Sequence, residues 1–273
     1  MTDDALAETL QAHYGLAARR AAEGCGTDAC GTAVEACAPG RAAGDDVFGA
    51  GSYGAAELAE LPAEAIAGSI GCANPVALAR LEPGEDVLDL GSGGGIDVLL
   101  SARRVGPGGR AYGVDMTAEM LELARANQAR AGVTNAEFLE GRIEAVPLPD
   151  GSVDVVVSNC VINLSADKPA VFAEAFRLLR PHGRLAVADV VSDHVPDPAL
   201  RADLAAWAGC LAGALTRSQY RALLADAGFV DIEIADDHAV GDGLWSAFVR
   251  ARRPGSVALR ADSLLDAHDD RHA

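Results

Sequence analysis

Six cysteines are the side chains of this 273-residue chain that could perform the most specific chemistry. Six thiols are too few for a disulfide scaffold at this length, and such thiols more often bind a metal or react. Structural zinc would call for closely spaced C-x2-C pairs, which the sequence lacks. Thiols that gather without histidine favour a soft, thiophilic centre instead. The candidates are Cys25, Cys30, Cys37, Cys72, Cys160 and Cys210.

The settings of three cysteines allow them to converge. Cys160 follows the valine-rich stretch 152–159, "SVDVVVSN", which predicts a buried strand. A cysteine that only fills space belongs inside a sheet, whereas Cys160 comes at the end of a strand. Cys72 in "SIGCANP" precedes the first strand, and Cys210 in "LAAWAGCLAGAL" lies on an expected helix after the fifth. All three thiols could therefore face one point.

A glycine-rich stretch, "DLGSGGGI" at 89–96, lies between a predicted strand and a predicted helix. Glycine lets backbone N–H groups approach a ligand closely, and such loops bind nucleotides at the open end of parallel sheets. A dinucleotide fingerprint would need glycine at position 96, where this chain has Ile96. Asp115 ends the next strand, where a carboxylate can accept hydrogen bonds from both ribose hydroxyls. An adenosine-containing cofactor without a 2'-phosphate fits this pattern.

The elements that position these residues alternate between strands and helices from about residue 84. Near-continuous valine and leucine predicts parallel strands covered on both faces, which gives a doubly wound α/β sheet. Helical periodicity marks 1–23, 62–71, 118–132, 169–183, 198–213 and 217–227. Strands are expected at 85–91, 109–115, 135–141, 152–159, 183–191, 230–236 and 244–251.

These elements divide the chain into four parts. We expect an N-terminal cap with a cysteine-bearing loop at 1–75 and a Rossmann-like cofactor-binding core at 76–192. Substrate-covering helices and final strands follow at 193–251, and a flexible tail at 252–273.

Composition limits the partners. Half of the residues are hydrophobic, which supports a folded core, and the net charge of -18 argues against nucleic acids and anionic lipid surfaces. No apolar run approaches the roughly 18 residues of a membrane helix, and "MTDDALAETL" lacks the features of a signal peptide. We therefore expect a cytoplasmic protein.

The D-x-G-x-G-x-G pattern followed by Asp115 resembles the class I S-adenosylmethionine-dependent methyltransferases. The resemblance implies that the glycine loop lies against the methionine part of the cofactor and that Asp115 holds the ribose. It also implies that Arg142 and Ile143 bracket the adenine, and that Asn159 lies beside the methyl donor. A glycine turn in another nucleotide-binding fold is the alternative. The expected cofactor contacts are Asp89, Gly91, Ser92, Gly93, Asp115, Met116, Arg142, Ile143 and Asn159.

Longer strings resemble the arsenite S-adenosylmethionine methyltransferases, over roughly residues 50–235: "SNCVINLSADK", "GCANP", "DLGSGGGIDVLLSARRVGP" and "WAGCLAGAL". The resemblance implies that Cys72, Cys160 and Cys210 bind trivalent arsenic, As(III). It further implies that an N-terminal cysteine, Cys25 or Cys30, joins Cys72 in redox chemistry. Where many relatives read "GCGNP", this chain has Ala73 in "GCANP", a small change that need not move the thiol.

The implied function is methylation of arsenite, and of methylarsenite, in arsenic detoxification. Trivalent arsenic bound to three sulfurs keeps a lone pair, so attack on a sulfonium methyl group needs positioning and no general base. Thiols that afterwards restore trivalent arsenic become a disulfide, which an external thiol such as glutathione or thioredoxin must reduce. Two alternatives remain: a methyltransferase for a small organic acceptor, with an apolar pocket and idle cysteines, and a non-catalytic arsenite-binding protein.

Overall fold

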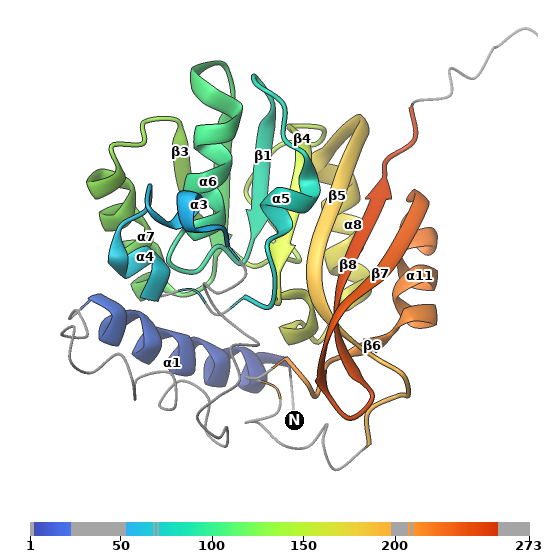
Figure 1. Cartoon of the computed structure of the whole chain (residues 1–273). Helices are drawn as coiled ribbons and strands as arrows, with labels where there is room; N and C mark the ends of the chain where they lie inside the picture. Colours follow the sequence, from blue (N-terminus) through green and yellow to red (C-terminus); the bar gives the residue numbers. More distant parts are fainter. Residues whose placement is uncertain are drawn as a thin grey trace, which may run out of the picture.

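The computed structural model describes residues 3–22, 53–67, 69, 71–197, 207 and 210–255. Cys25, Cys30 and Cys37 lie outside the described residues, as does 256–273 of the expected tail. In the described part, a central sheet carries helices on both faces (Figure 1). The predicted doubly wound α/β fold is therefore confirmed.

The sheet has the strand order β3-β2-β1-β4-β5-β8-β7, and β6 pairs with β5. Strands β1 to β5 run parallel, whereas β8 is antiparallel to β5 and β7 is antiparallel to β8. The order reverses between β1 and β4, and such a switch point opens a crevice at the carboxyl ends of the strands. The bounds are β1 Asp86–Leu90, β2 Arg110–Asp115, β3 Ala136–Glu140, β4 Val153–Asn159, β5 Leu179–Ser192, β6 Leu215–Thr216, β7 Val230–Gly241 and β8 Leu244–Arg252.

Helices cover both faces of the sheet. Apolar side chains of α8 and α11 pack on one face, and those of α5, α6 and α7 pack on the other. α1 crosses the carboxyl ends of the parallel strands (Figure 1). The bounds are α1 Asp3–Ala22, α3 Ala55–Leu58, α4 Ala63–Ala67, α5 Pro75–Ala79, α6 Ile96–Val105, η2 Gly106–Gly108, α7 Ala118–Ala131, η3 Ile162–Leu164, α8 Lys168–Leu178 and α11 Arg217–Asp226.

Two predicted helix ends are wrong. The helix expected over 169–183 stops at Leu178, since β5 begins at the next residue and Pro181 cannot donate a helical hydrogen bond. The helix expected over 198–213 does not continue through Cys210, which lies in a turn with φ 61°. Gly213 packs so tightly that an added Cβ would meet the carbonyl oxygen of Asn163 at 1.9 Å. The chain must turn at Cys210 for Gly213 to lie this close to Asn163.

The C-terminal strands belong to the main sheet. β7 and β8, expected in the substrate-covering part, extend the sheet beyond β5. Arg252 ends β8, and the guanidinium of Arg253 donates to the carbonyl of Phe176 at 2.8 Å, so both residues are held in place although they were assigned to the tail. Among the described residues, no helix has the length and apolarity to cross a membrane.

Candidate active site

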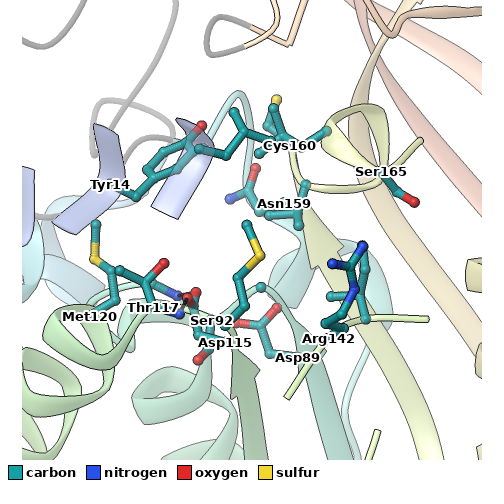
Figure 2. Close-up of a pocket in the computed structure, with 18 of the residues that line it drawn as sticks. Tyr14, Asp89, Ser92, Asp115, Thr117, Met120, Arg142, Asn159, Cys160 and Ser165 are labelled. Atoms are coloured by element: carbon teal, nitrogen blue, oxygen red, sulfur yellow. Dashed lines mark hydrogen bonds between the residues drawn. The ribbon is translucent and has the colours of Figure 1, made fainter. Parts of the chain in front are cut away.

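A cavity of about 1110 Å³, counting its open mouth, lies at the carboxyl ends of β1, β2 and β4. Figure 2 shows polar side chains of the sheet loops on one side and Tyr14 of α1 on the other. Leu6 and Leu10 of α1 continue this wall. The structure brings every predicted cofactor-contacting residue to the cavity: Asp89, Gly91, Ser92, Gly93, Asp115, Met116, Arg142, Ile143 and Asn159.

The glycine loop connects β1 to α6 through backbone conformations that require glycine. Gly91 has φ 75° and Gly95 has φ 89°, in the left-handed region. A Cβ at Gly91 would lie 2.4 Å from the side chain of Val161, and one at Gly95 would lie 2.8 Å from that of Phe138. The loop therefore packs too closely for side chains, which leaves its backbone at the cavity surface.

Asp115 is held by backbone donors in a geometry suited to two hydroxyls. Its Oδ2 accepts from the N–H of Gly93 at 2.9 Å, and its Oδ1 accepts from the N–H of Thr117 at 2.8 Å. Burial raises the pKa of Asp115, and these N–H groups act against that rise. Because a carboxylate oxygen can accept more than one hydrogen bond, both oxygens keep capacity for a ribose hydroxyl.

Asp89 and Ser92 supply buried oxygens that need a donor. Asp89 is 3% exposed, and its Oδ1 has no hydrogen-bond partner among the described residues; the same holds for Oγ of Ser92. Burial, followed by the charges of Asp97 and Asp115, raises the pKa of Asp89 well above its usual value. Buried polar atoms are normally paired, so a cationic ligand group here would satisfy them. The ammonium group of S-adenosylmethionine, the cofactor that the family resemblance implies, would satisfy these oxygens.

Cys72, Cys160 and Cys210 lie in one buried cluster with Leu6 and Leu10 of α1. Cys72 and Cys160 form a disulfide with their Cα atoms 6.0 Å apart. The thiol of Cys210 donates to the carbonyl of Cys160 at 2.8 Å. Burial is the main cause that raises the pKa of Cys210. The predicted convergence of the three cysteines is thus present in the structure.

The backbone at two of these cysteines is unusual. Cys160 has φ 56° and Cys210 has φ 61°, a region that costs a non-glycine residue about 1–3 kcal/mol. Hydrogen bonds from the N–H of Cys160 to Ala188 and from the N–H of Cys210 to Trp207 hold these conformations. Strain of this kind gathers at functional sites, and here it turns both thiol-bearing residues toward one cavity that they line.

The redox pairing in the structure differs from the expected one. The family resemblance implies an N-terminal partner for Cys72, whereas the structure bonds Cys72 to Cys160. Cα atoms 6.0 Å apart are within the range that a disulfide spans. The roles of Cys25 and Cys30 stay predictions, since both lie outside the described residues.

Sequence reasoning missed three residues at the site. Tyr14 lies in the stretch 1–23, for which the sequence predicts only a helix, yet it lines the cavity. Asp97 and Tyr53 form a buried hydrogen bond of 2.8 Å behind the glycine loop. A carboxylate inside the apolar run that opens α6 is a local signal that could have indicated Asp97. Tyr53 has no comparable signal.

Comparisons with known proteins agree on the family. A family model described as a methyltransferase domain matches residues 81–228. The arsenite methyltransferase of Halobacterium salinarum is 41% identical over 247 residues, covering 84% of this chain and 63% of that relative. The arsenite methyltransferase of Aquipseudomonas alcaligenes is 43% identical over 190 residues, covering 67% of this chain and 54% of that relative.

A solved structure of similar fold agrees with these relatives on the family. The X-ray structure of an arsenic(III) S-adenosylmethionine methyltransferase from Chlamydomonas reinhardtii is 34% identical, with a TM-score of 0.65, and the match covers 74% of this chain and 73% of that one. The chain belongs to the arsenite S-adenosylmethionine methyltransferase family. The family and fold class expected from the sequence are thereby confirmed. This family member spans 63% and 54% of the lengths of the two curated relatives.

Proposed function

We propose that this protein transfers the methyl group of S-adenosylmethionine to trivalent arsenic held by Cys72, Cys160 and Cys210. The observation that carries the proposal is the position of the cysteine cluster: Cys160 and Cys210 line the same cavity as the glycine loop and Asp115. The arsenite methyltransferases at 41% and 43% identity support the choice of substrate.

The cofactor side of the cavity would bind S-adenosylmethionine through complementary charges and hydrogen bonds. The buried Oδ1 of Asp89 would accept from the cofactor's ammonium group, and Asp115 would accept from its ribose hydroxyls. Arg142 and Ile143 would bracket the adenine, as the family resemblance implies. When bound, the cofactor supplies an electrophilic methyl group on a sulfonium. These contacts orient that group without any base from the protein.

The arsenic side would bind a neutral substrate in an apolar environment. Neutral arsenite, As(OH)3, exchanges three hydroxyl groups for three cysteine sulfurs, and each exchange releases one water molecule made from a hydroxyl and a thiol proton. No free proton is produced, so the raised pKa of Cys210 does not oppose binding. The bound arsenic keeps its lone pair for the methyl group. Catalysis then depends on holding the two groups in line.

The Cys72–Cys160 disulfide supports a need for an external thiol. Methyl transfer raises arsenic from the trivalent to the pentavalent state, and two thiolates return it to the trivalent state when they form one disulfide. Two of the proposed arsenic ligands are unavailable for binding while that disulfide persists. Two thiols, from two glutathione molecules or from the dithiol of thioredoxin, must therefore reduce it by exchange before each new cycle and leave as a disulfide themselves. Detoxification, use of methylarsenite and a cytoplasmic location stay predictions.

The direct test is product formation. The reduced protein is incubated with S-adenosylmethionine, arsenite and glutathione, and arsenic species are separated by chromatography with elemental detection. We expect methylated arsenic. A folded protein that binds the cofactor and forms no methylated arsenic would refute the proposal.

The apolar wall of α1 favours one other function, methylation of a small organic acceptor. Leu6 and Leu10 line the cavity, as a methyltransferase for a small organic acceptor would require. That function leaves the three cysteines without a role, so cysteine-to-serine variants should not change its arsenite titration. A non-catalytic arsenite-binding protein would lose arsenite binding in those variants and yet give no methylated product.

A further inference from the structure

The position of Cys72 depends on contacts from outside its own segment. Cys72 lies between α4 and α5, before the first strand of the sheet, whereas Cys160 directly follows β4. The two residues are 88 positions apart in the sequence. Hydrogen bonds from the sheet must therefore hold the Cys72 segment beside the end of β4.

The side chain of Asn159, the last residue of β4, supplies two of these hydrogen bonds, and the hydroxyl of Ser246 on β8 donates a third to the carbonyl of Cys72 at 3.3 Å. Oδ1 of Asn159 accepts from the N–H of Cys72 at 3.0 Å, and its Nδ2 donates to the carbonyl of Ala73 at 2.8 Å. One carboxamide thus pairs with the backbone on both sides of the thiol. A Cβ at Gly71 would lie 2.1 Å from Nδ2 of Asn159, so only glycine lets the segment come this close.

Tyr53 and Asp97 fix the orientation of that carboxamide. Nδ2 of Asn159 also lies 3.1 Å from the hydroxyl of Tyr53 and 3.2 Å from Oδ2 of Asp97. The hydroxyl of Tyr53 donates to Oδ1 of Asp97 at 2.8 Å. Because Tyr53 and Asp97 accept hydrogen bonds, the amide nitrogen of Asn159 must face them. Its Oδ1 then faces the N–H of Cys72.

These contacts give Asn159 a role beside the cofactor contact that the family resemblance implies, which stays a prediction. Its two amide hydrogens already face three acceptors within the protein, so that cofactor contact would not be a donated hydrogen bond. We propose that Asn159 is a positioning residue for arsenic capture, which holds Cys72 within reach of Cys160. The inference rests on the proposed function for the identity of the captured element, but the thiol geometry can be tested without it.

The test compares three variants of the full-length, reduced protein. Asn159→Ala removes the link to Cys72, and Tyr53→Phe removes only the hydroxyl that orients it. Ser158→Ala is the matched control, because it deletes a buried hydrogen bond of 3.1 Å, to Leu90, on the same strand without touching the network. Arsenite alone is titrated and followed by tryptophan fluorescence, to which Trp207, packed against the cysteine cluster, contributes beside Trp245.

We expect Asn159→Ala to bind arsenite about 10-fold more weakly, which is the usual effect of one or two lost hydrogen bonds. Tyr53→Phe should lose about 3-fold, and Ser158→Ala should match the wild type. The affinity for S-adenosylmethionine, measured by calorimetry, should stay within about 2-fold in Tyr53→Phe and Ser158→Ala, and in Asn159→Ala it should fall less than the arsenite affinity does. A loss of cofactor affinity in Asn159→Ala as large as its loss of arsenite affinity would overturn the assignment.

A second measurement separates positioning from the proposed function. In glutathione redox buffers, the equilibrium constant for the Cys72–Cys160 disulfide reports how closely the two thiols are held. We expect the equilibrium constant for formation of this disulfide to fall about 10-fold in Asn159→Ala, whether or not the wild type methylates arsenic. An unchanged constant would overturn the inference. If Asn159→Ala does not fold, Tyr53→Phe decides: unchanged arsenite affinity and an unchanged disulfide equilibrium in that variant would refute it.

Discussion

Replacing Asp97 with asparagine should remove a contribution to the free energy of unfolding that is present at low pH and absent at neutral pH. Asp97 is 3% exposed, and burial raises its pKa from the ordinary 3.8 to about 6. Hydrogen bonds from Tyr53 and Asn159, and the charge of Arg104, limit that rise. Because the folded-state pKa is raised, the native state takes up the proton at a higher pH than the unfolded chain does. This group therefore stabilises the fold fully below pH 3.8, and the contribution is lost as pH rises through about 6.

The magnitude follows from the difference of about 2 pKa units. At 1.36 kcal/mol per unit, the full contribution is about 3 kcal/mol. The linkage relation gives about 2 kcal/mol at pH 4.5 and close to zero at pH 7.5. The unfolding free energy of the wild type, minus that of Asp97→Asn, should therefore increase by about 2 kcal/mol between pH 7.5 and pH 4.5. Any pH-independent cost of the substitution cancels in this comparison.

The assay is urea unfolding at both pH values, followed by circular dichroism in a phosphine reductant that keeps the cysteines reduced. Asp89 needs a control, since the charge of Asp97 contributes to its raised pKa. The same substitution is therefore also made in an Asp89→Asn background. A difference that stays constant from pH 7.5 to pH 4.5 in that background would show that Asp97 is not destabilised by burial, and the reasoning would be wrong.

Three further predictions concern the candidate site. Cys160→Ser should abolish arsenite methylation while calorimetry gives an unchanged cofactor affinity; retained activity would remove this thiol from the mechanism. Asp115→Ala should weaken S-adenosylmethionine binding about 100-fold, because two hydrogen bonds to a charged group are lost, and an unchanged calorimetric Kd would contradict its ribose role. Gly91→Ala should lower the unfolding free energy by more than about 3 kcal/mol, since it adds a clash with Val161 to a left-handed φ. Gly132→Ala, with φ 65° and open space around its Cβ, should cost only about 1–2 kcal/mol, and equal costs in urea unfolding would rule out the clash.

The parts of the fold that local patterns determine could be predicted from the sequence. Val153, Val155, Val156 and Val157 are all fully buried in β4, and such a run indicates a covered parallel strand wherever it occurs. The glycine loop is equally local, because its spacing reflects positive φ values and close packing over a few residues. The turn at Cys210 could not be predicted, since it depends on the approach of Gly213 to a distant carbonyl.

The candidate site required contacts that no local pattern encodes. The end of a predicted strand was enough to place Cys160 at the cavity. Its bond to Cys72 was not predictable, because it depends on the carboxamide of Asn159 meeting a segment 87 residues earlier. The wall formed by α1 was missed for the same reason: Leu6 and Leu10 predict a helix with an apolar face, but not the surface that this face covers.

The left-handed backbone at Cys160 and Cys210 has a consequence for protein engineering. Introducing three cysteines at equivalent positions of another methyltransferase would supply the sulfur atoms but not the directions of their Cα–Cβ bonds. Loops that follow ordinary right-handed torsions would aim those sulfurs elsewhere. A transplanted copy of the proposed arsenic site would therefore have to include both turns, together with the carbonyl groups of Ala188 and Trp207 that hold them.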